Sequence, residues 1–410
     1  MAGFGASQGF QGFQGFQGFQ GFQGFQGFQG FQGFGAPLAP GADPATSFAL
    51  TSSREELVQR RIVTPWNPPR VHGTDAGLPP LDDLDLFEGW AEDIRVENCL
   101  IELMQPLHLS VENKEFHIWH IVLGAVGSAV VSASAYPVLQ ITRPPVELFQ
   151  AQTQQVFDMS DLRNERMAEI VSQIGIPMHF WASIVDLNLS SKPRTLELLS
   201  IALACLSHVN QFAKKAFGCP RPTAYSPSIQ PMINPRRFSA FPCGHGAEAF
   251  LVARVLQELS RQTDFIGTGK ERKEGSLRQQ LQRLAKRISD NRVVAGVHFQ
   301  IDNVVGRMVG ETMAEYIISR CKEGSEWQPR RFVGEGTMTK DEDKEERKPL
   351  AQMLKDFDRH EPMDKADADA QGKSLAPYFE GLSPKPRDTS KSNLMRHVWG
   401  KAMQEWADWR

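Results

Sequence analysis

The second half of the chain is a succession of helix-length segments bounded by glycine or proline, and this pattern most constrains the fold. The longest, TLELLSIALACLSHVNQFAKKAF, is followed within three residues by Pro220, and proline lacks the N–H that a continuing helix needs. It is preceded by DMSDLRNERMAEIVSQIG and followed by GAEAFLVARVLQELS, GSLRQQLQRLAKRIS and NVVGRMVGETMAEYIISRCK. Strand-like alternation of apolar and polar residues is scarce. We therefore expect a mainly α protein built as a helical bundle.

One apolar run, from Ile118 to Leu139, has about the length of a bilayer span. It is rich in Gly, Ala and Ser, it carries His120, and the sequence has no second run of this kind. We expect a buried helix of a soluble protein and no integral membrane association. Because the N-terminus shows no charged-then-apolar secretion signal, we expect a cytoplasmic location.

Composition argues against two classes of function. The formal net charge of −3 gives no basic face for nucleic acid. The five cysteines show no CxxC spacing, so the sequence indicates neither a disulfide framework nor a zinc cluster.

We divide the chain into four parts. Residues 1–45 are a low-complexity arm dominated by Gln-Gly-Phe repeats, which we expect to be disordered. It is either a segment that self-associates or a repeat expansion without a role, and the sequence leaves both open. Residues 46–195 are an N-terminal helical region, and residues 196–322 are the catalytic bundle. Residues 323–410 are polar in composition, and we expect a charged, largely disordered tail with a Trp-rich end.

The Trp-rich end places Trp399, Trp406 and Trp409 among basic residues. Such a segment can dock on a partner, lie on a membrane surface or pack on the body of its own protein. Because large aromatic side chains favour burial, we expect the last of these.

Three short patterns carry the chemistry. In KKAFGCPRP, Lys214 lies in the last turn of a helix and Arg221 follows the break. In PCGH, Gly244 opens another helix, whose free N–H groups favour an anion. In NRVVAGVH, Arg292 precedes a glycine break and His298 stands at the entrance of the next helix. Three cations and two helix starts predict a pocket for a compact tetrahedral oxyanion such as phosphate.

Two histidines, His245 and His298, divide the chemistry: one contacts the central atom and the other moves a proton. Asp302 follows His298 by four residues. Its carboxylate either holds one ring nitrogen of His298 or caps the first turn of the helix, and the sequence leaves both open. Candidates for a carboxylate that orients His245 are Asp158, Asp161 and Asp186.

In this order and spacing, Lys-x6-Arg-Pro, Pro-Cys-Gly-His and Asn-Arg-x3-Gly-x-His resemble the signature of the vanadium-dependent haloperoxidase and phosphatidic acid phosphatase type 2 superfamily. The match runs from Lys214 to His298, with helix of the family type to about Cys321. The resemblance implies helical bundles of the haloperoxidase and acid phosphatase type. It also implies that His298 is either the metal ligand, bonded to vanadate, or a phosphorylated nucleophile.

The remaining roles also follow from the resemblance. It implies that His245 is the general acid and base and that Lys214 polarises the reacting oxygen. It implies that the oxygens of the cofactor or substrate are held by Lys214, Arg221, Cys243, Gly244 and Arg292.

The sequence departs from the family pattern at three positions. Cys243 stands where the family has serine, and a thiol is a poorer donor that peroxide or hypohalite oxidises, which favours a phosphatase. Asn291 stands where serine is usual, and Gln211 where chloroperoxidase-like members tend to have tryptophan. Phe238 does resemble the chloroperoxidase-like enzymes, and the region from Leu81 onward could supply the extra bundle of large haloperoxidases.

The leading hypothesis is a vanadate-dependent haloperoxidase that uses hydrogen peroxide to oxidise halide to hypohalous acid or to halogenate an organic acceptor. The alternative is a soluble acid phosphatase that forms a phosphohistidine at His298 and needs no cofactor. A third reading is an inactive bundle that assembles through the Gln-Gly-Phe arm and the Trp-rich tail. The sequence leaves the oligomeric state open.

Overall fold

The computed structural model describes residues 81–126, 129–235, 237–261, 265–266, 273–274, 277–334, 339–341, 344–346, 379–382 and 392–407. The Gln-Gly-Phe arm, the Pro-rich stretch up to residue 80, Trp409 and most of the polar sequence between 335 and 391 lie outside these residues. The predictions made for them, and the domain boundaries, stay predictions.

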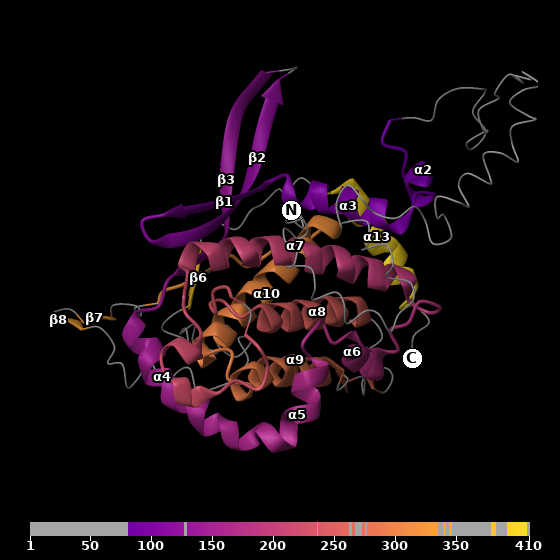
Figure 1. Cartoon of the computed structure of the whole chain (residues 1–410). Helices are drawn as coiled ribbons and strands as arrows, with labels where there is room; N and C mark the ends of the chain where they lie inside the picture. Colours follow the sequence, from indigo (N-terminus) through magenta and orange to yellow (C-terminus); the bar gives the residue numbers. More distant parts are fainter. Residues whose placement is uncertain are drawn as a thin grey trace, which may run out of the picture.

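The body is a bundle of four long helices: α7 (Pro193–Phe217), α8 (Gly244–Ser260), α9 (Leu277–Val294) and α10 (Gln300–Cys321). They run through the middle of the molecule, and α8 contacts the other three (Figure 1). The protein is mostly helical with a small sheet, which confirms the predicted fold class.

The central helix α7 begins and ends where its sequence marks it. Pro193 occupies the first turn, where its missing N–H has no intrahelical partner to lose. Gly218 ends the helix with a φ of 60°, which glycine adopts without strain. In the described residues one segment, Pro193–Ala224, is long and apolar enough to cross a membrane by length and composition, and 78% of its most apolar window is buried inside the protein. That burial is typical of a core helix.

Helix α10 packs closely on the first turns of α8 at two glycines, Gly306 and Gly310. A Cβ added at Gly306 would lie 2.5 Å from the carbonyl oxygen of Cys243, and one at Gly310 would lie 2.1 Å from that of Ala247. Only glycine allows the backbones to come this close. The start of α8 is thereby fixed against α10.

Shorter helices cover the bundle: α2 (Leu84–Glu88), α3 (Glu92–Met104), α4 (Val146–Asp158), α5 (Arg163–Ser172) and α6 (Met178–Val185). Three short 3-10 turns accompany them: η3 (Met159–Leu162), η4 (Pro222–Ala224) and η5 (Pro227–Ile229). The helix predicted from DMSDLRNERMAEIVSQIG is present as η3 followed by α5, and α5 packs on α9.

The apolar run from Ile118 to Leu139 is not a buried helix, so that prediction is wrong. It forms most of an antiparallel pair, β2 (Glu115–Val126) and β3 (Ala129–Thr142), which extends away from the bundle (Figure 1). Ile and Val, branched at Cβ, favour strands. At its base Ile118 and Leu139 face each other and are fully buried, whereas Leu123 further out is 61% exposed. The sequence does not reveal the alternation of a strand here, because small residues rather than charged ones separate the large apolar side chains.

The hairpin belongs to a five-stranded sheet in the order β1-β2-β3-β6-β9. The other strands are β1 (Leu107–Glu112), β6 (Arg330–Phe332) and β9 (Phe379–Gly381), and only the β3–β6 pairing in this sheet is parallel. Two separate strand pairs are short: β4 (Phe265–Ile266) with β5 (Lys273–Glu274), and β7 (Thr339–Asp341) with β8 (Lys344–Glu346).

We expected a charged, largely disordered tail over residues 323–410, but the residues around β6 are partly buried in the body of the protein. Trp327 is 1% exposed and its indole N–H donates to the carbonyl of Pro137 at 2.9 Å. Phe332 is fully buried. A three-residue strand needs too few apolar residues to stand out in a polar segment.

The C-terminal helix α13 (Asn393–Gln404) packs against α7 and α3. Trp399 and Trp406 are 6% and 1% exposed, and the indole N–H of Trp406 donates to the Thr195 hydroxyl at 2.9 Å. The prediction that this end packs on the body of the protein is confirmed for these two tryptophans.

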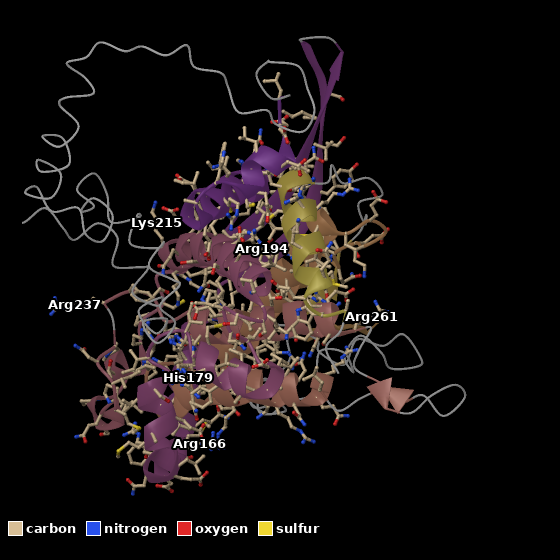
Figure 2. The ribbon with its side chains drawn as sticks, turned by 90° about the vertical axis from the view of Figure 1, so that its right-hand side faces the viewer. Arg166, His179, Arg194, Lys215, Arg237 and Arg261 are labelled. Carbon is tan, nitrogen blue, oxygen red and sulfur yellow. The ribbon has the colours of Figure 1, made fainter. Side chains whose placement is uncertain are left out.

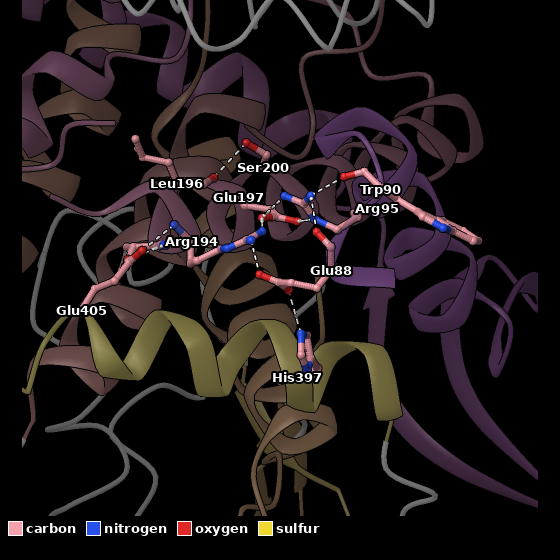
Figure 3. Close-up of polar contacts among 10 residues, drawn as sticks. Glu88, Trp90, Arg95, Arg194, Leu196, Glu197, Ser200, His397 and Glu405 are labelled. Atoms are coloured by element: carbon pink, nitrogen blue, oxygen red, sulfur yellow. Dashed lines mark hydrogen bonds and ion pairs between the residues drawn. The ribbon is translucent and has the colours of Figure 1, made fainter. Parts of the chain in front are cut away.

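Polar contacts fasten α13 to the start of α7 (Figure 3). Arg194 forms ion pairs with Glu88 and Glu197, and His397 of α13 contacts Glu88 at 2.8 Å. Glu405, just past α13, accepts the backbone N–H of Arg194 at 2.6 Å. The chain's last described turn therefore caps the N-terminus of its central helix.

Candidate active site

The three sequence patterns meet at one cavity of about 120 Å³. It lies where the end of α7 and the beginning of α8 face the connection between α9 and α10. Among its lining residues are Lys214, Arg221, Gly244, His245, Arg292 and His298. The structure thus brings together the five side chains, and the glycine, that the sequence predicted to converge.

Two neighbouring cations point elsewhere. Lys215, adjacent to Lys214, is exposed, and Arg237, at the start of the loop that leads to α8, is exposed as well. Figure 2 shows both at the outer edge of the molecule, with Arg237 directed away from the body. Neither lines the cavity.

Lys214 is held by main-chain oxygens. It is 3% exposed, and its ammonium donates to the carbonyls of Ser239, Ala240 and Pro242 at 3.0, 3.0 and 2.5 Å. Burial lowers the pKa of Lys214 to about 8, because the charged form loses its hydration. The loop before α8 therefore fixes the position of this cation.

Arg221 lies between the His298 ring and the Phe238 ring. Its Nη1 is 3.0 Å from His298 Nε2 and donates to the carbonyl of Val297 at 2.7 Å. The guanidinium lies 5.1 Å from the centroid of the Phe238 ring, and Lys214 Nζ lies 5.2 Å from the same centroid. Phe238 thus contacts two cations of the cavity at once.

Arg292 belongs to the buried stripe of α9, formed by Leu281, Ala285, Ile288 and Arg292. It is 1% exposed and donates to the carbonyls of Gln173 and Ile170 at 3.2 and 3.3 Å. Its Nε is buried and has no hydrogen-bond partner in the described part of the chain. Burial lowers the pKa of this guanidinium to about 10.

Asn291, the residue in place of the usual serine, anchors the end of α5. Its amide donates to Glu169 and Gln173, at 2.9 Å each. Gln173 also contacts the Arg292 guanidinium at 3.4 Å. Asn291 therefore positions Arg292 through the residues that follow α5.

His298 is held as a neutral ring with a defined tautomer. Its Nδ1 lies 3.0 Å from Asp302 Oδ2, while an Arg221 N–H points at Nε2. Nδ1 therefore carries the proton and Nε2 the lone pair. Burial first, and then the charge of Arg221, lowers the pKa of His298 well below its usual value.

Asp302 fulfils both roles that the sequence left open. The oxygen that accepts from His298 also accepts the backbone N–H of Phe299 at 2.9 Å, at the start of α10. Burial raises the pKa of Asp302 to about 7, and the Phe299 N–H acts in the opposite direction.

His245 lines the cavity from the first turn of α8. Its Nε2 contacts the carbonyl oxygen of Ile174 at 3.1 Å, and because a carbonyl only accepts, Nε2 carries the proton in this contact. Of the carboxylates considered as its partner, Asp158 and Asp186 accept hydrogen bonds from side chains close to them in sequence.

Cys243 lies just behind the cavity wall. It is fully buried and caps α8, its sulfur accepting the N–H of Gly246 at 3.4 Å. Burial raises the pKa of the thiol to about 11, so it is neutral. Gly244 lines the cavity and Cys243 does not. The predicted contact between this side chain and an oxyanion stays a prediction.

Four polar residues of the cavity wall were missed in the sequence: Ser207, Asn210, Asn234 and Glu248. Asn210 precedes Lys214 by one turn of α7, and Glu248 follows Gly244 by one turn of α8. The i, i+4 spacing to predicted site residues could have found Asn210 and Glu248. Gln211 and Phe238, which were compared with the chloroperoxidase-like members of the family, also line the cavity.

Residues 196–323 match the family model described as the PAP2 superfamily, which includes vanadium haloperoxidases and phosphatidic acid phosphatases. The matched range contains all of the cavity's predicted residues. The search of curated proteins found no match for the chain.

Proposed function

Because residues 196–323 match a superfamily of phosphatases and haloperoxidases, we propose that this protein is an oxyanion-binding enzyme of that kind. We further propose that it hydrolyses phosphate monoesters through a phosphohistidine at His298. Three cations and the Gly244 N–H at the start of α8 line the cavity, and this donor set suits the oxygens of a phosphoryl group.

The observation that carries the proposal is the state of His298. Asp302 accepts its Nδ1–H, and the low pKa of the ring keeps Nε2 unprotonated. In the structure the Nε2 lone pair accepts an N–H of Arg221 in the cavity wall, and Arg221 would have to turn this N–H to a phosphoryl oxygen before Nε2 attacks. A neutral imidazole held in this way is a nucleophile next to the group that would bind the phosphoryl oxygens.

In the proposed reaction, Nε2 of His298 attacks phosphorus, and the bond from phosphorus to the alcohol oxygen breaks. His245 gives a proton to the departing oxygen. Water then attacks phosphorus while His245 takes a proton back, the phosphorus–nitrogen bond breaks, and inorganic phosphate leaves. Lys214, Arg221 and Arg292 stabilise the charge on the phosphoryl oxygens throughout.

One feature of the site favours hydrolysis over halide oxidation. Cys243 is a thiol in the position of the family's serine, and hypohalous acid formed nearby would oxidise it.

The test is hydrolysis of 4-nitrophenyl phosphate by the purified full chain. We expect turnover that orthovanadate and inorganic phosphate inhibit, and a loss of about 1,000-fold or more in His298→Ala. His179→Ala, a change at an exposed histidine outside the cavity, is the control and should keep full activity. Quenched turnover should trap an acid-labile, alkali-stable phosphoprotein. Turnover that survives in His298→Ala would refute the proposed nucleophile.

A vanadate-dependent haloperoxidase is the second candidate. Phe238 favours it, because this residue lines the cavity and resembles the chloroperoxidase-like enzymes. In the described residues no three His, Cys, Asp or Glu side chains cluster to hold a metal cation, but vanadate is an oxyanion that needs one imidazole and several donors. The unpartnered Arg292 Nε fits this requirement, and His298, Lys214, Arg221 and Arg292 would hold the group. Bound vanadate would act as a Lewis acid that activates hydrogen peroxide for halide oxidation.

Metal analysis with a dye-bromination assay separates the two candidates. The haloperoxidase predicts bromination by hydrogen peroxide and bromide that appears only after vanadate is added. The hydrolase predicts that vanadate abolishes phosphate-ester turnover and produces no bromination.

A further inference from the structure

The cavity holds a buried acceptor that the proposed chemistry does not use. Asn210 is 5% exposed and lines the cavity. Its amide oxygen is buried, with no hydrogen-bond partner among the residues that the structure describes. Buried side-chain oxygens normally have a partner. Asn210 therefore brings to the cavity wall an acceptor that the described residues leave unsatisfied.

A second acceptor, Glu248, lies at the same point of the wall. A Cβ added to Gly244 would be 3.2 Å from Asn210 Nδ2, 3.9 Å from Glu248 Oε1 and 4.0 Å from Lys214 Cε. Asn210 from α7 and Glu248 from α8 therefore flank Gly244 in the cavity wall. The charge of Glu248 acts on both Lys214 and Arg292, in the direction that favours their protonated forms.

Acceptors in this position are unfavourable for a bare anion. A carboxylate repels phosphate or vanadate, and an amide oxygen has nothing to accept from them once they are fully ionised. Both become favourable if the bound molecule has an N–H or O–H donor close to its phosphoryl group. Because the cavity has a volume of about 120 Å³, ligands with a small attached group are the suitable probes.

We infer that Asn210 and Glu248 form a subsite for a hydrogen-bond donor on the alcohol of the substrate. The substrate class is phosphate monoesters of small alcohols that carry an ammonium or a hydroxyl group near the ester oxygen. This inference rests on the proposed function only where it calls the ligand a substrate. The subsite itself is a binding property and can be measured without turnover.

The experiment compares three phosphonates of nearly equal size by titration calorimetry: 2-aminoethylphosphonate, 2-hydroxyethylphosphonate and propylphosphonate. We expect the full chain to bind the first about tenfold more tightly than the third, as a hydrogen bond to a charged group allows. The Asn210→Leu change, which keeps the side chain's size, should remove the preference for both donors. The Glu248→Gln change should remove the preference for the ammonium and affect the hydroxyl less.

The control variant is Glu112→Gln, the same chemical change at an exposed residue of β1 outside the cavity, and it should keep the wild-type ratio. Propylphosphonate reports the folded oxyanion site. It should bind Asn210→Leu and Glu112→Gln as it binds the wild type, and Glu248→Gln at least as tightly, because that change removes a negative charge. Equal binding of the three phosphonates by the wild type, or a preference that survives in both cavity variants, would overturn the subsite. Loss of propylphosphonate binding in folded variants would also overturn it, by assigning the two residues to the oxyanion site.

Turnover of 4-nitrophenyl phosphate, measured on the same preparations, tests the proposed function separately. Phosphonate preference without turnover keeps the subsite and removes the hydrolase. Turnover without preference keeps the hydrolase and removes the subsite.

Discussion

Asp302 Oδ2 accepts hydrogen bonds from two donors at once, His298 Nδ1 at 3.0 Å and the backbone N–H of Phe299 at 2.9 Å. The first contact fixes the tautomer of the ring, and the second caps the start of α10. The other carboxylate oxygen is buried with no partner in the described residues. A single carboxylate therefore couples the position of the proposed nucleophile to the start of a core helix.

Replacing Asp302 by asparagine should impair catalysis more than stability. The amide keeps the shape and can still accept both N–H groups, but it lacks the charge that supports the ring when phosphorus bonds to Nε2. We expect kcat to fall about 10- to 100-fold with little change in KM. Steady-state kinetics with 4-nitrophenyl phosphate measure both.

Asp290→Asn is the matched control for this change. Asp290 pairs with Lys286 at 2.7 Å on α9 and does not line the cavity. We expect its kcat to stay within about twofold of the wild type, as for a partly exposed i, i+4 pair. If Asp302→Asn destabilises the protein but leaves kcat unchanged, the main role of Asp302 is to cap α10 and not to orient the His298 ring.

The pH profile of kcat/KM should be a narrow bell with its maximum between about 7 and 8. Asp302, with a pKa raised to about 7, is ionised above that pH and then accepts the Nδ1–H, so activity falls as pH drops below 7. Lys214, with a pKa lowered to about 8, loses its charge above that pH, so activity falls again.

The Asp302→Asn variant separates these two limbs. In this variant the fall in activity below pH 7 that comes from protonation of Asp302 should disappear. The fall at higher pH that comes from Lys214 should stay. The substrate's own ionisation affects both proteins alike and cancels in the comparison. In the kcat profile the basic limb should move to higher pH, because bound phosphate favours the charged ammonium. Superimposable profiles for wild type and variant would remove Asp302 from the titration.

The sequence predicted the long helices because their ends carry local signals. Pro193 and Gly218 mark the limits of α7, and the apolar stripe of α9 shows its period within a single segment. The cations of the site were also predictable, because Lys214 and Arg221 keep a fixed spacing across a helix break. Signals of this kind lie within a few residues of the element they define.

What escaped prediction depends on contacts between distant segments. The carbonyls that hold Arg292 belong to Ile170 and Gln173, far away in sequence. The hairpin of β2 and β3 was missed because its apolar and small residues fit a helix as well as a strand. Trp327 and β6 are buried only because a sheet edge is present to receive them.

Cys243→Ser should stabilise the protein. The sulfur accepts the Gly246 N–H at 3.4 Å as the N-cap of α8, and a hydroxyl is a stronger acceptor in that position. We expect a gain of about 0.5–1 kcal/mol in the free energy of unfolding, measured by urea denaturation. Phosphate-ester hydrolysis should change little, whereas a haloperoxidase would gain activity and resistance to peroxide.

Cys205→Ser is the matched comparison for Cys243→Ser, because the same sulfur-to-oxygen change is made inside a helix, where no cap is needed. Cys205 is fully buried in the apolar core, so the hydroxyl loses its hydration. We expect a loss of about 1–3 kcal/mol. Destabilisation by both substitutions would mean that Cys243 behaves as a core residue and not as a cap.

Glu405→Gln should weaken the attachment of the C-terminal segment. The carboxylate accepts the backbone N–H groups of Arg194 and Thr195 at 2.6 and 2.8 Å and the Thr195 hydroxyl at 2.7 Å. A charged acceptor at a helix N-terminus also interacts with the helix dipole, which a neutral amide does less well. We expect a loss of about 1–2 kcal/mol in the free energy of unfolding.

Glu323→Gln removes a carboxylate that also fastens this segment but lies at the surface. Glu323 pairs with Arg396 of α13 at 2.6 Å, with 74% of the glutamate side chain exposed. Solvent screens such a pair, so we expect a change below about 0.5 kcal/mol. Because Glu405 caps the N-terminus of α7, amide exchange should also rise at the start of α7 in Glu405→Gln and stay unchanged in Glu323→Gln. Equal effects of the two substitutions would show that α13 is held by its buried tryptophans and not by the cap.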